Sequence, residues 1–167
     1  MVLGLSLQSF TLIHVIISLV AIASGVVVLI GMLGSHRMQG WTTLFLLTTV
    51  LTSVTGFLFP FHGFTPAIGV GIISCLLLAL ALLGLYGKHL VGAWRWIYVV
   101  GAVSAFYLNV FVLIVQSFQK VPALHALAPT QSEPPFLIAQ AIALAVFLVA
   151  GLLAASRFRP ASNMVAH

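Results

Sequence analysis

The sequence predicts an all-helical bundle that crosses a membrane five times, with the N-terminus outside and the C-terminus in the cytoplasm. First, 62% of the 167 residues are hydrophobic and only 4% are charged. A soluble domain carries about a quarter of its residues as charged groups, so lipid is the expected solvent. Second, five apolar runs reach roughly the 17–25 residues that cross a bilayer. Third, Lys and Arg are divided unevenly between the two ends of these runs. We expect one transmembrane domain over residues 1–167.

The first span is expected at about residues 10–33. No basic segment precedes it, and its apolar run is longer than the core of a signal peptide, so we expect it to stay attached. One of its faces carries small or polar side chains at helical spacing. In lipid, such a face belongs against neighbouring helices, because small side chains let backbones approach closely. Its members are His14, Ser18, Ala21, Gly25 and Met32.

The second span is expected at about residues 41–59 and is rich in hydroxyl side chains. Thr49 and Ser53, like Thr52 and Gly56, have the spacing of small residues at membrane helix interfaces. Hydroxyls in a helix can donate to carbonyls of the preceding turn, so they need no ligand to be satisfied. Helix packing is therefore the expected role of this span.

The third span is expected at about residues 67–86, starting next to Pro66, a residue favoured in the first helical turn. The fourth covers about 94–119 and presents Gly101, Ala105, Asn109 and Gln116 on one face. Asn109 lies about 15 Å from the Gln119 end of that helix, near the middle of the bilayer. A carboxamide at that depth needs a partner inside the bundle, so we expect it to contact the first or second span.

The fifth span is expected at about residues 136–155, with Ser132 as its N-cap and Pro134 and Pro135 at its entry. The connection over residues 120–135 is the longest in the chain. It is expected to be a loop, and it holds the only acidic residue, Glu133.

Orientation follows from the basic residues, because Lys and Arg flank membrane spans on the cytoplasmic side. Lys120 is alone on one side of the expected bundle. The other side carries five basic residues: Arg37, Lys88, Arg95, Arg157 and Arg159. An aromatic belt is expected at the same interface, formed by Trp41, Trp94, Trp96 and Tyr98.

This orientation places three histidines at or near the outer face: His14, His62 and His125. Imidazoles near a carboxylate suit copper, zinc or iron, and two at matched depth can hold a haem. We therefore predict a redox-associated site for haem b or a transition metal, with these histidines as ligands. The surrounding amides would be Asn109, Gln116 and Gln140. For His14 alone, a hydrogen bond to a neighbouring helix is the competing interpretation.

Other functional classes have less support in the sequence. It contains no GxSxG, P-loop or HExxH motif and no pair of carboxylates, so no reaction is predicted. Basic residues are not interleaved with aromatics in a run, which argues against nucleic-acid binding. The single Cys75 excludes an intrachain disulfide.

The first third of the chain resembles a group of uncharacterised bacterial multi-span membrane proteins. The similarity is carried by His14, by the turn Ser35-His36-Arg37-x-x-Gly40, and by the ending Thr55-Gly56-Phe57 of the Thr-rich span. Those proteins carry a histidine in span one and an HRxxG turn. The resemblance implies a multi-pass protein of the bacterial inner membrane and leaves the activity open.

Two further hypotheses stand beside the redox site. The chain could be a cofactor-free accessory subunit of a larger membrane complex, or a homo-oligomer, that buries its small-residue faces against partners. It could instead be a quinone- or lipid-binding module that uses Asn109, Gln116 and the aromatic residues of the loops.

Overall fold

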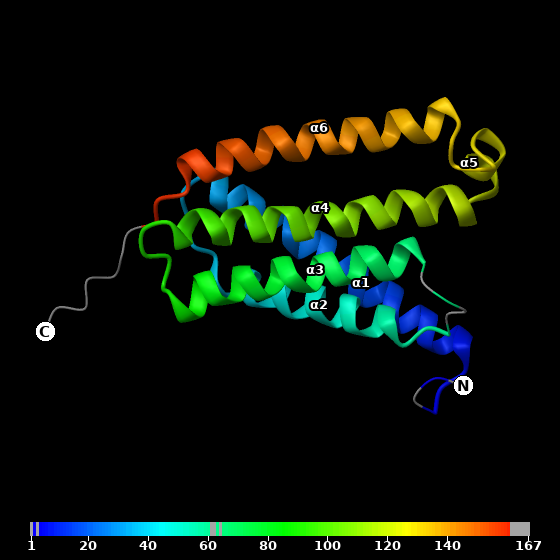
Figure 1. The fold of residues 1–167 in the computed structure, drawn as a ribbon, viewed down its shortest axis with the longest axis horizontal. Helices are drawn as coiled ribbons and strands as arrows, with labels where there is room; N and C mark the ends of the chain where they lie inside the picture. The colour runs from blue at the N-terminus through cyan, green and yellow to red at the C-terminus, as the bar shows by residue number, and fades with distance from the viewer. Residues whose placement is uncertain (1, 3, 61–62, 64, 161–167) are drawn as a thin grey trace, which may run out of the picture.

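The structure, a computed structural model, describes residues 2, 4–60, 63 and 65–160. Five helices are long and apolar enough to cross a bilayer, which confirms the all-helical, multi-span prediction (Figure 1). With α3 and η1 taken together as the third span, Pro66–Gly87, each expected span begins and ends within three residues of the observed one, and the largest difference is at the start of α1. The helices, with one short connecting helix and one π-helical turn, are α1 (Leu7–Leu33), α2 (Gln39–Phe57), α3 (Pro66–Leu82), η1 (Leu83–Gly87), α4 (Trp94–Lys120), α5 (Pro122–Leu127) and α6 (Pro134–Arg157).

The helix starts follow local capping rules, with one correction. The Thr65 hydroxyl accepts from the backbone N–H of Ile68, and Pro66 occupies the first turn of α3 as expected. Ser132 is not the N-cap of α6, contrary to the prediction. Glu133 takes that position, in an extended conformation. The helical region is disfavoured for a residue before a proline, so Glu133 stays extended and the helix begins at Pro134.

The connection between α4 and α6 is more ordered than the expected loop. Pro122 starts α5, and the connection is secured by a small apolar cluster of Phe118, Ala128 and Phe136. The rings of Phe118 and Phe136 meet edge to face, with centroids 5.4 Å apart. This cluster holds α5 across the ends of α4 and α6.

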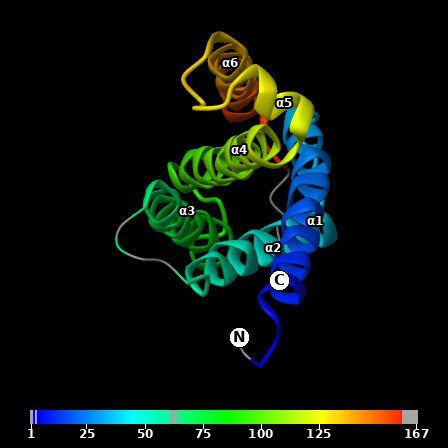
Figure 2. The same ribbon diagram turned by 90° about the vertical axis from the view of Figure 1, so that its right-hand side faces the viewer.

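The four helices α1 to α4 form a ring in which each packs against its neighbours, and α6 lies outside it against α4 and α1 (Figure 2). Small residues set the closest approaches, as expected for the first and fourth spans. A Cβ at Gly25 would lie 2.8 Å from the Phe106 ring, and one at Gly101 would lie 2.8 Å from the Leu77 carbonyl oxygen. These contacts fix where α1 and α3 meet α4.

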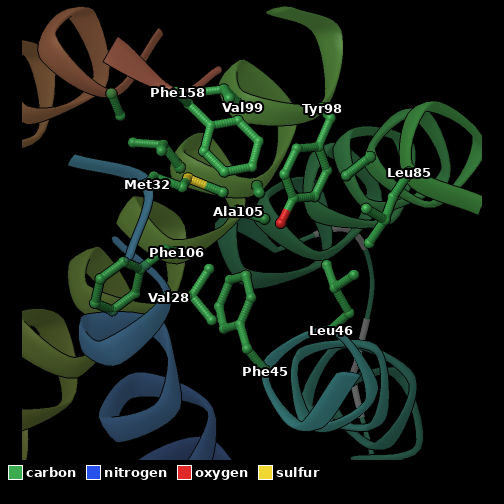
Figure 3. Packing of buried hydrophobic residues seen from close by; sticks show 14 of the residues in the cluster. Val28, Met32, Phe45, Leu46, Leu85, Tyr98, Val99, Ala105, Phe106 and Phe158 are labelled. Atoms are coloured by element: carbon green, nitrogen blue, oxygen red, sulfur yellow. The ribbon is translucent and has the colours of Figure 1, made fainter. Parts of the chain in front are cut away.

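The basic residues predicted to share one side do lie at one end of the bundle, here called the basic end. It comprises the α1–α2 turn, the η1–α4 turn and the end of α6 (Figure 1). Lys120 is at the opposite end, here called the Lys120 end. The main hydrophobic core fills the half towards the basic end, and Figure 3 shows its side chains from close by. Its largest buried side chains include Met32, Phe45, Leu46, Leu85, Tyr98, Phe106 and Phe158.

Two details of this core depart from the sequence analysis. Tyr98 was assigned to an interfacial belt, yet only 2% of its surface is exposed, and its ring packs on Phe158. Phe158 follows the end of α6, and the chain there turns back into the core. Arg95 donates to the Phe158 carbonyl, and the Arg159 N–H donates to the Ser35 hydroxyl at 2.8 Å. These contacts close the basic end.

Candidate ligand-binding cavity

A cavity of about 690 Å³ occupies the half of the bundle towards the Lys120 end, between α1, α2, α3 and α4. Along α1 its wall runs from Leu7 to Ile22, a length of about 22 Å. Along α4 it runs from Leu108 to Val121. Most of its wall is apolar, and representative side chains are Val15, Leu19, Phe57, Ile68, Val112 and Leu113.

The cavity is blind at one end and reaches the molecular surface at the other. Beyond Ile22 and Leu108 the interior is filled by the core around Val28, Phe45 and Phe106. At the Lys120 end, the wall residues Leu7 and Val121 are 48% and 44% exposed. Along the wall, Leu19 of α1 and Leu113 of α4 are 49% and 38% exposed. A molecule entering the cavity would therefore meet a closed floor.

His14 lines this cavity and is held in place from α2. Its Nδ1 lies 2.7 Å from the Thr55 hydroxyl oxygen, so the predicted hydrogen bond to a neighbouring helix is confirmed. That hydroxyl in turn donates to the Leu51 carbonyl at 2.6 Å. The Phe59 ring stands edge-on to the imidazole, with centroids 5.2 Å apart. Thr55 with its Leu51 contact, and Phe59 beyond the end of α2, thus hold the imidazole in one orientation.

Asn109 lines the floor of the cavity and makes the predicted contact inside the bundle. Its Nδ2 donates to the hydroxyl oxygen of Thr49 on α2 at 3.3 Å, and Thr49 is fully buried. Gln116 lies about two turns from Asn109 on the same wall. Among the residues that the structure describes, the Gln116 amide has no hydrogen-bond partner, so it is free to meet a ligand.

The predicted ligand set divides into two groups. His14, Asn109 and Gln116 share the cavity. His125 is exposed on α5, which packs over the ends of α4 and α6, and does not line the cavity. His62 lies outside the described residues. Within the described ranges, no three His, Cys, Asp or Glu side chains gather closely enough to hold a metal ion.

Gln140, the third predicted amide, lies on α6 and faces α4. Its Nε2 donates to the Phe111 carbonyl at 3.2 Å, and its Oε1 is buried without a partner in the described part of the chain. Gln140 is thus a helix-packing residue outside the cavity wall.

The Glu133 carboxylate forms hydrogen bonds within its own turn. It accepts from the Thr130 N–H and hydroxyl, and from the Ser132 N–H. Desolvation raises the pKa of the Glu133 carboxyl, but these hydrogen bonds outweigh it and hold the pKa below its ordinary value. The carboxylate therefore braces the turn that enters α6.

Several cavity residues were missed by the sequence analysis. Lys120 lies at the rim, and Phe57 and Phe59 stand at the same end. The small residues Gly56, Gly71 and Ser74 line the walls of α2 and α3. At Gly71 the missing side chain makes room for the Phe57 ring, which a Cβ would meet at 2.8 Å. The spacing of these small residues was visible in the sequence, but the same spacing also marks close helix packing. Only the arrangement of all four helices shows that these residues border a cavity.

None of the protein-family models, curated proteins or solved structures compared with the chain matches it.

Proposed function

We propose that this chain is a multi-pass membrane protein that binds a lipophilic molecule of the quinone class in the cavity between α1 and α4. The observation that carries the proposal is the cavity itself. Its volume of about 690 Å³ lies within the range of roughly 300–1,000 Å³ typical of small-molecule sites. Such sites are mostly apolar with a few placed polar groups, and His14, Asn109 and Gln116 are such groups here.

The closed floor supports binding rather than passage. A quinone combines a flat polar ring with an isoprenoid tail. The ring would lie among His14, Phe57 and Phe59, and the tail would lie along the apolar side chains of α1 and α4. The exposed wall residues Leu19 and Leu113 are apolar, which suits entry from the hydrocarbon of the bilayer.

The binding test uses purified protein in mild detergent, titrated with decylbenzoquinone by isothermal titration calorimetry. Gly56→Leu should weaken binding about tenfold or more, because the new side chain projects into the cavity. A Cβ at Gly56 meets only the His14 ring, at 3.8 Å, so the backbone need not move. Gly40→Leu is the matched control. It makes the same exchange on the same helix, where a Cβ meets nothing within 4 Å.

Unchanged affinity in Gly56→Leu, or equal losses in both variants, would contradict this assignment. The haem or metal hypothesis is tested on the same sample by its visible absorbance and elemental analysis. One equivalent of either, lost in His14→Ala, would replace the quinone proposal.

We further propose that the basic end faces the cytoplasm of a bacterial inner membrane, as the basic residues and the resemblance favour. Cysteine labelling of whole spheroplasts tests this in a Cys75→Ser background. A membrane-impermeant maleimide should label Ser132→Cys and should spare Ser35→Cys until the membrane is opened. The reverse pattern would invert the bundle.

A further inference from the structure

The hydrogen bonds around His14 determine which ring nitrogen carries a proton. The Leu51 carbonyl can only accept, so the single hydroxyl proton of Thr55 is used in the 2.6 Å contact with it. The Thr55 oxygen must then accept from the imidazole Nδ1 at 2.7 Å. In the neutral ring, Nδ1 is therefore the donor, and Nε2 is a hydrogen-bond acceptor.

Asn109 also carries a free acceptor. Its Nδ2 donates to the Thr49 hydroxyl oxygen, and its Oδ1 has no donor among the described residues. An amide oxygen can only accept. Two residues that line the cavity thus carry a free acceptor, His14 at Nε2 and Asn109 at Oδ1, while the second Asn109 N–H and the Gln116 amide add donors to the same wall.

The acceptor on His14 distinguishes the two redox states of a quinone. A quinone carbonyl can only accept, so it leaves the His14 Nε2 unpaired. A quinol hydroxyl donates to it. Sites built around a hydrogen bond reject analogues that cannot make it, because a desolvated polar group then stays unpaired.

We propose that the cavity selects a lipophilic phenol, the reduced quinol form of the quinone class, over the carbonyl form. This inference rests on the proposed function and adds the hydroxyl donor as the recognised group. The aromatic head is favoured over an aliphatic alcohol because Phe59 stands beside His14 and Phe57 lines the same cavity. The rings of aromatic side chains make favourable edge-to-face contacts with the aromatic ring of a ligand, and an aliphatic chain cannot make them.

The test compares two probes that differ only in the donor, 4-nonylphenol and its methyl ether. Binding to the purified full-length protein is measured by isothermal titration calorimetry, as for the quinone. The phenol should bind about tenfold more tightly or better. Equal affinities would overturn the donor selection while leaving the binding function intact. Binding of neither probe would overturn the phenol proposal, and the decylbenzoquinone titration then decides the proposed function separately. A 1-dodecanol titration separates an alcohol-bearing lipid from a phenol; tighter binding of dodecanol would contradict the aromatic assignment.

Variants assign the preference to His14. His14→Phe keeps a ring but removes Nε2, so it should abolish the difference between the probes while the ether still binds. Thr55→Val removes the oxygen that holds Nδ1 and should reduce the preference. Thr48→Val is the matched control, because its hydroxyl is bonded to the Leu44 carbonyl and lies outside the cavity wall. A phenol preference that survives His14→Phe would exclude His14 as the acceptor.

The tautomer has a readout that does not depend on ligand binding. In ¹⁵N-histidine-labelled protein, the signal lost in His14→Phe should show a protonated Nδ1 and an unprotonated Nε2 at alkaline pH, where the ring is neutral. The opposite tautomer would remove the basis of the proposal.

Discussion

At the residue scale, the hydroxyl side chains of α2 show what a sequence can and cannot predict. Spacing and chemistry indicated that they would bond to carbonyls of the preceding turn, and Thr48, Thr52, Ser53 and Thr55 all do so. That pattern is local, so it can be read from one helix. The second role of Thr55, as acceptor for His14, depends on how α1 lies against α2. No spacing within either helix contains that information.

The internal contact of Asn109 could be predicted from its position in the sequence, because an amide in the middle of a span must find a partner inside the bundle. We expect Asn109→Leu to destabilise the protein by about 0.6 kcal/mol, the average for hydrogen bonds between membrane helices. A double-mutant cycle with Thr49→Val, measured by unfolding in SDS, isolates the pair. Coupling near zero would show that the 3.3 Å contact contributes nothing to stability.

At the element scale, the spans were predicted well because length and hydropathy alone determine them. The connection over residues 120–135 was not. α5 has only six residues, too few for an apolar period to stand out, and its position depends on Phe118 and Phe136 of the two flanking helices. Gln140 was predicted to lie at the ligand site, whereas it packs against α4. Nothing in α6 itself shows whether that face meets α4 or the cavity.

Glycine-to-alanine substitutions test the helix packing. The same exchange should lower the stability of the protein at Gly101 and leave it unchanged or raise it at Gly40. Gly101→Ala should destabilise the fold, because its Cβ would lie 2.8 Å from the Leu77 carbonyl oxygen, a backbone atom that cannot yield easily. Gly40→Ala should be neutral or slightly stabilising, by up to about 1 kcal/mol, because alanine favours helix and nothing lies within 4 Å. Unfolding in SDS measures both. Similar effects at the two sites would contradict the close approach of α3 and α4.

α6 differs from the other spans in how little of it is covered. It packs on α4 and α1, and Leu152, Ile142 and Val149 are 72%, 60% and 59% exposed. An apolar face of this kind suits lipid. Whether a larger complex or a second copy covers part of it stays a prediction, tested by native mass spectrometry of the protein released from the membrane.

At the scale of the whole molecule, the bundle is packed in one half and hollow in the other. The core near the basic end depends on a residue outside every helix, Phe158, which is 2% exposed. Hydropathy marks spans, so a single aromatic after the last span carries no signal of its burial. The hollow half was equally hidden, because polar and small residues on a face predict contact with helices and with ligands alike.

Phe158→Ala should therefore destabilise the protein by about 3–5 kcal/mol, as the loss of a buried aromatic ring does in other cores. Leu152→Ala is the control, since that side chain is 72% exposed and faces away from the bundle. SDS unfolding should separate the two variants clearly. A small loss in Phe158→Ala would mean that the end of the chain does not complete the core.

The return of the chain at Phe158 has a consequence for the order of assembly. Every cavity-lining residue lies between Leu7 and Val121, so the binding site belongs to a part of the chain that is synthesised before α6. The hydrogen bonds at the basic end form later, because Arg95 and Ser35 bond to Phe158 and Arg159, which follow α6 in the chain. During biogenesis, a ligand taken from the bilayer could thus occupy its pocket, and hold α1 against α4, before translation delivers the residues that lock the bundle.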